Sequence, residues 1–76
     1  MNNPRRKELE AIRNQIEELK ESLSEILEQE EEYRDNIPEN LQGSERYEKS
    51  DNACDNLSSA VDQLDEVMNC IEEAGE

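Results

Sequence analysis

The chain has 76 residues, of which 32% are hydrophobic and 39% charged, and its 22 acids against 8 bases give a net charge of -14. A chain of this length forms one small domain with a modest core. The charge excludes a whole-surface grip on nucleic acid, which needs basic patches, and an anionic membrane would repel the protein.

An apolar seam predicts a first helix at about residues 4–35. Its members alternate in spacing between three and four residues, which places them on one side of an α-helix. They are Leu9, Ile12, Ile16, Leu19, Leu23, Ile26 and Tyr33. Asn3 is expected to cap this helix, with Pro4 at its first position. Disordered acidic chains do not hold such a seam over many turns, so we expect helix.

Residues 36–44 are expected to form a turn. Pro38 disfavours the helical conformation at the residue before it, and Gly43 permits a positive φ. Ile37 and Leu41 are expected to fold back as an apolar plug under this turn.

A second seam predicts a helix at about residues 45–74, with Ser44 as its N-cap. The seam consists of Tyr47, Ser50, Cys54, Leu57, Val61, Leu64, Met68 and Ile71. Four further apolar residues flank it at intervals of seven, namely Ala53, Ala60, Val67 and Ala74. The resulting apolar face is wider than a two-stranded seam and is typical of a helix bundle.

The fold class is therefore all-α, an antiparallel two-helix coiled-coil hairpin that occupies residues 1–76 as a single domain. The two seams can be aligned so that Leu9 lies opposite Ile71 and Leu23 opposite Leu57. This register also puts Glu30 opposite Ser50, so the one polar residue in each seam falls in the same layer.

A two-helix hairpin buries one stripe per helix, which seldom suffices for stability in water. We therefore expect a homodimer that forms a four-helix bundle. The expected self-association face consists of Leu27, Ala53, Cys54, Leu57, Ala60, Val61, Leu64, Val67, Met68 and Ile71.

Three basic residues, Arg5, Arg6 and Lys7, have the wrong sign for the positive end of a helix dipole. In the hairpin they would lie beside the acids of residues 72–76 and pair with them. The alternative is that they form an anion site.

No residue pattern indicates catalysis. The chain has no His and only two Gly, and its two cysteines do not have metal-ligand spacing. Cys54 and Cys70 fall on one helix roughly 24 Å apart, too far for a disulfide within the chain. We expect no enzyme activity, no cofactor and no metal site.

Acids are concentrated on both sides of the turn. The candidate acidic docking surface consists of Glu28, Glu31, Glu32, Asp35, Glu39, Glu45, Glu48, Asp51 and Asp55. Glu30 also belongs to this run, against which stand only three bases, at positions 34, 46 and 49. The run is either a solubilising face or a docking surface for a basic partner, and divalent cations would bind it weakly.

The stretch at residues 35–48 reads DNIPENLQGSERYE. It resembles uncharacterised small acidic helical proteins of phages, prophages and gut Firmicutes, and the resemblance continues into the spacing of Ala53, Leu57 and Ala60. This group has no assigned activity, so the resemblance implies a phage or prophage setting and not a mechanism. No signal peptide or transmembrane run is apparent, and we expect the protein in the cytoplasm of a bacterial host cell.

Three functions follow as hypotheses. The first is a non-enzymatic, self-associating acidic hairpin that binds a basic host protein in a regulatory or accessory role, without direct nucleic-acid or membrane binding. The alternative is a nucleic-acid mimic that inhibits a host DNA-binding or anti-phage defence protein. A further alternative is a sponge for a small anionic nucleotide signal, held between subunits by Arg5, Arg6 and Lys7.

Overall fold

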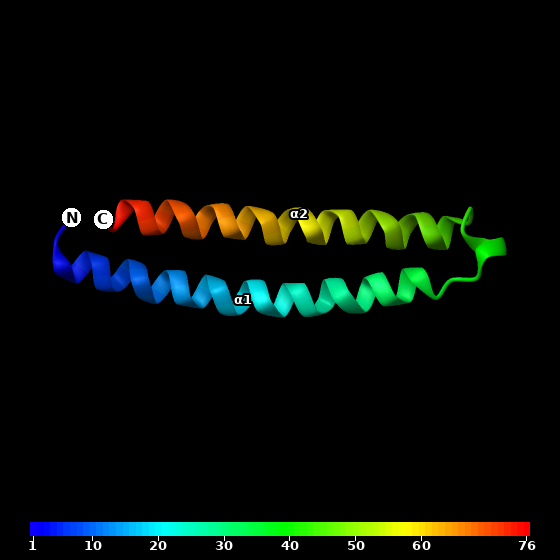
Figure 1. The fold of residues 1–76 in the computed structure, drawn as a ribbon, viewed down its shortest axis with the longest axis horizontal. Coiled ribbons are helices and arrows are strands. Elements are labelled where there is room, and N and C mark those ends of the chain that lie inside the picture. The colour runs from blue at the N-terminus through cyan, green and yellow to red at the C-terminus, as the bar shows by residue number, and fades with distance from the viewer.

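The computed structural model describes all 76 residues as two long antiparallel helices joined by a short turn (Figure 1). Helix α1 spans Asn3–Asp35, the short 3-10 helix η1 spans Glu39–Leu41, and α2 spans Glu45–Ala74. The Cα positions extend over 59 × 15 × 12 Å, so the molecule is a narrow rod. Both termini lie at one end and the turn at the other (Figure 1). The predicted all-α hairpin is confirmed.

Both helices begin at a side-chain cap. Ser44 Oγ accepts a 3.3 Å hydrogen bond from the Tyr47 backbone N–H, as predicted. The first helix is capped one residue earlier than predicted, because Asn2 Oδ1, and not Asn3, accepts a 3.0 Å hydrogen bond from the Arg5 backbone N–H. Asn2 has the extended backbone of a cap, with φ -78° and ψ 164°, and Asn3 is already helical.

The predicted plug under the turn is half right. Ile37 is buried, whereas Leu41 is 44% exposed. The backbone N–H of Leu41 bonds to the Pro38 carbonyl oxygen at 2.8 Å, and this 3-10 turn leaves the Leu41 side chain in solvent. Gly43 does not use a positive φ, so a turn of this length closes here without left-handed backbone.

A polar layer fixes the register of the two helices. Ser50 Oγ donates a 2.8 Å hydrogen bond to Glu30 Oε1, which confirms that these two residues face one another. Ser50 is buried, as are Cys54 and Met68 farther along α2. The interior of the hairpin is therefore a single narrow stripe.

The predicted seam of α1 is wrong at every second position. Four apolar residues expected in the interior are exposed, namely Ile12 at 46%, Leu19 at 62%, Ile26 at 51% and Tyr33 at 42%. The residues that turn toward α2 in their place are the half-buried Arg13, Lys20, Leu27 and Arg34. In this rotation the three cations are half-buried, with their alkyl stems against the hairpin and their charged ends within reach of acids along one edge of α2.

Candidate interaction surfaces

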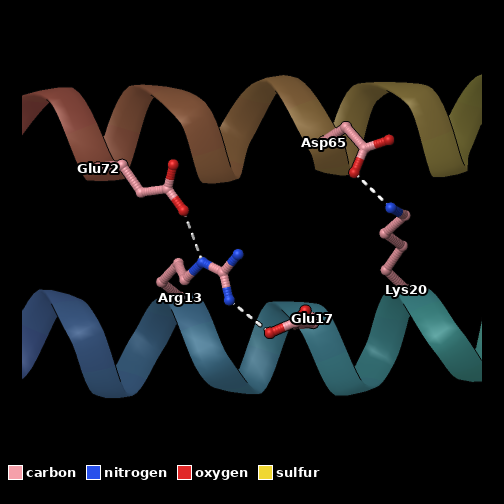
Figure 2. Close-up of polar contacts among 5 residues, drawn as sticks. All are labelled: Arg13, Glu17, Lys20, Asp65 and Glu72. Atoms are coloured by element: carbon pink, nitrogen blue, oxygen red, sulfur yellow. Dashed lines mark hydrogen bonds and ion pairs between the residues drawn. The ribbon is translucent and has the colours of Figure 1, made fainter.

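Ion pairs join the helices along one side of the hairpin. Arg13 Nε lies 2.8 Å from Glu72 Oε1, and Lys20 Nζ lies 2.5 Å from Asp65 Oδ1. Figure 2 shows both cations reaching from α1 across to α2, while Glu17 binds Arg13 from within α1. Near the turn, Arg34 Nη1 lies 3.1 Å from Asp51 Oδ1. We call this edge of the hairpin the ion-pair side.

The arginines of this side are held firmly in their charged form. Hydrogen bonds from Arg13 to Glu72 and to Glu17 raise the pKa of its guanidinium. A hydrogen bond to Asp35 likewise raises the pKa of Arg34. Solvent-exposed ion pairs add little to stability, so these pairs accompany the rotational setting of α1 and do not determine it by themselves.

The opposite side of the hairpin is defined by a contact between Tyr33 and Arg46. Arg46 Nε donates a 2.5 Å hydrogen bond to the Tyr33 hydroxyl, and its guanidinium carbon lies 5.2 Å from the ring centroid. Residues seven apart lie on the same side of a coiled-coil helix. The residues that precede Tyr33 in steps of seven on α1, and those that follow Arg46 in steps of seven on α2, therefore form two stripes on this side. We name them together the apolar face, formed by Ile12, Leu19, Ile26, Tyr33, Ala53, Ala60, Val67 and Ala74.

The structure separates the ten residues of the predicted self-association face. Cys54 and Met68 are buried in the hairpin interior. Five more of the ten are half-buried and also face the interior, namely Leu27, Leu57, Val61, Leu64 and Ile71. Only Ala53, Ala60 and Val67 lie on the apolar face. Sequence reasoning missed the four large residues of α1 that dominate this face, although their spacing of seven marked them as one stripe.

The candidate acidic docking surface gathers at the turn end of the rod. Three of its nine acids are engaged in ion pairs, Asp35 and Asp51 with Arg34 and Glu45 with Lys49. The other six make no ion pair within the chain, and they are Glu28, Glu31, Glu32, Glu39, Glu48 and Asp55. No three acidic, His or Cys side chains come together in the manner of a metal site. The surface therefore offers unpaired negative charge.

Arg5, Arg6 and Lys7 are exposed near the start of α1, at the end of the rod that carries both termini. None makes an ion pair, and Arg6 donates a 3.4 Å hydrogen bond to the main-chain oxygen of Glu76. The expected ion pairs between these three residues and the C-terminal acids are absent, and Arg13 on the ion-pair side pairs with Glu72 instead. A groove beside them is lined by Arg6 and Arg13 together with Glu10 and Glu72, so its two cations are matched by two carboxylates.

The two cysteines differ in environment. Cys54 is buried between the helices, and burial raises the pKa of its thiol. Cys70 is exposed, and both thiols are free. Cys54 therefore acts as a small core residue, as its place in the seam predicted.

Comparison with protein families, with curated proteins and with solved structures found no match to this chain. Neither α1 nor α2 has an apolar stretch of the length that crossing a membrane requires.

Proposed function

We propose that this protein is a non-enzymatic, self-associating acidic helical hairpin that binds a basic protein. Its role would be regulatory or accessory in a phage or prophage setting within a bacterial cell. The observation that carries this proposal is the set of six carboxylates at the turn end that have no cation of their own chain as a partner.

Unpaired carboxylates on rigid helices are suited to docking. Side chains held on helices keep their spacing, and a surface of one sign attracts a partner of the opposite sign and speeds its association. Ion pairs with bases of the same chain would have cancelled the negative potential of these carboxylates. At the turn end, only Arg34 and Lys49 make ion pairs.

The test compares two variants of equal net charge. The first, the docking variant, carries Glu28→Gln, Glu31→Gln, Glu32→Gln and Glu39→Gln, four of the six unpaired acids of the docking surface. The control carries Glu18→Gln, Glu21→Gln, Glu25→Gln and Asp62→Asn, all exposed and free of ion pairs in the middle of the rod. Each is used as bait for basic proteins from a bacterial lysate.

We expect a specific basic partner to be retained by the unmodified chain and by the control and lost with the docking variant. Equal loss with both variants would mean that only net charge matters. Equal retention by both would remove the turn end from the proposal.

A nucleic-acid mimic is the second candidate, favoured by the supply of unpaired carboxylates from α1, the turn and α2 at one end of the rod. Such a mimic would displace duplex DNA from the basic groove of its target. Displacement measured by fluorescence anisotropy is expected to disappear with the docking variant and to persist with the control. A partner that binds the hairpin and DNA at the same time would rule the mimic out.

A further inference from the structure

We infer that the apolar face binds a second copy of this chain, so that two hairpins pack face to face as a four-helix bundle. This inference rests on the self-association in the proposed function and assigns it to a surface. The surface differs from the one that the sequence predicted, because it is dominated by α1.

The exposure of α1 is the first observation. Leu19 is 62% exposed and Ile26 is 51% exposed in the hairpin, although both lie in a stripe that repeats every seven residues. Contiguous apolar surface of this kind marks an interaction site in soluble proteins. A seven-residue repeat is the pattern by which one helix packs along another, so a helical occupant fits it.

The distribution of acids is the second observation. The rows that flank the apolar face on its outer edges are Glu8, Gln15, Ser22, Gln29 and Asn36 on α1 and Lys49, Asn56, Gln63 and Cys70 on α2. These rows and the face hold one acid, Glu8, although 22 of the 76 residues in the chain are acidic.

A surface that binds a basic partner carries carboxylates at its rim. The rim of the apolar face is neutral and therefore does not suit a basic partner. A second copy presents an identical neutral rim and apolar centre, which is the self-complementarity that a two-fold interface requires. Two copies would meet here with Glu8 as the one acid that each chain brings to the contact.

The layers of the face have complementary sizes. Stepping by seven from the contact between Tyr33 and Arg46 gives three apolar layers, two of which pair a large side chain with an alanine. They are Ile26 with Ala53, Leu19 with Ala60, and Ile12 with Val67. If α1 of each copy lies against α2 of the other, large residues meet alanines in the two central layers, as well-packed cores require.

The area is sufficient for a stable dimer. The hairpin is 59 Å long and 15 Å wide at the level of Cα atoms, which accommodates the roughly 800 Å² per partner that standard interfaces bury. Only four residues are buried within one hairpin, so a second copy also enlarges the small core of the single chain.

Hydroxyl-radical footprinting of the unmodified chain tests the inference directly. Leu19, Ile26 and Tyr33 are compared with Leu41, a turn residue that is 44% exposed and lies off the apolar face. When the concentration is raised until the mass doubles, we expect oxidation of the three face residues to fall several-fold and that of Leu41 to stay constant. A doubled mass with no protection of these residues would overturn the assignment and leave self-association intact. A mass that never doubles would overturn both.

A pair of variants gives an independent result. Leu19→Gln with Ile26→Gln removes two large side chains from the face, and the dimer dissociation constant is expected to rise at least about 100-fold. Because both side chains are exposed in the single hairpin, the variant monomer should keep its helical circular dichroism. The control, Glu18→Gln with Glu25→Gln, changes the adjacent exposed residues and should dimerise at least as tightly as the unmodified chain. Equal dissociation constants for the two variants would contradict the inference.

Discussion

The Ser50 hydroxyl donates a 2.8 Å hydrogen bond to Glu30 Oε1 in the interior of the hairpin. This bond joins the polar residues that interrupt the two apolar seams. It satisfies a buried hydroxyl on α2 and occupies one oxygen of a half-buried carboxylate on α1. A shifted register would leave both groups facing apolar side chains, so the pair favours the observed alignment.

The first prediction concerns this layer. Ser50→Ala should lower the free energy of unfolding by about 1 kcal/mol, because Glu30 loses its partner. Replacing both residues, with Glu30→Leu and Ser50→Ala, should recover the loss, since no polar group is then left unpaired. Chemical denaturation measures both, with the exposed Ser58→Ala as control. A double variant less stable than Ser50→Ala alone would contradict the assignment of the layer.

The second prediction concerns thiol accessibility. Cys70 is exposed and Cys54 is buried between the helices, so iodoacetamide should alkylate Cys70 at least about ten times faster in the folded protein. The two rates should converge in denaturant. Mass spectrometry of the labelled peptides gives both rates from one sample. Equal rates without denaturant would mean that the hairpin opens readily.

The third prediction is a loss of stability at alkaline pH. Burial raises the pKa of the Cys54 thiol, so the folded state holds its proton more tightly than the unfolded state does. This contribution is present below the ordinary thiol pKa of about 8.5 and is lost as the pH rises through the higher value of the folded protein. Unfolding measured at a series of pH values should therefore show a steeper alkaline decline for the unmodified chain than for Cys54→Ala. Parallel curves would contradict the prediction.

The fourth prediction concerns salt. Each chain carries a net charge of -14, so two copies repel one another. Added sodium chloride screens this repulsion and should tighten the dimer. The exposed ion pairs of the ion-pair side weaken in salt, but such pairs contribute little. Sedimentation velocity at low and at high salt measures the change, and a dimer that dissociates in salt would indicate an interface held by charge.

The seam of α2 was predictable because one pattern fits it. Cys54 and Met68 occupy its spacing of three and four, and flanking residues such as Ala53 are too small to compete for the interior. The cap at Ser44 was predictable for the same reason, since a single residue before the helix carries a suitable side chain.

The rotation of α1 was not predictable from its own residues. Leu9, Ile16 and Leu23 can be completed into a seam by Ile12 on one side or by Arg13 on the other. Hydrophobicity favours Ile12, whereas in the structure Arg13 is the residue that turns toward α2 and pairs with Glu72, and only the arrangement of both helices decides between them. The same limit applies to the docking surface, where composition revealed the acids but not which of them Arg34 neutralises.

The most direct measurement is the solution mass of the unmodified chain by sedimentation equilibrium, from low micromolar to millimolar concentration and at high salt. A self-associating hairpin predicts a transition to twice the 8.8 kDa of one chain. A mass of one chain at every concentration would contradict self-association, and the apolar face would then be open in the free protein.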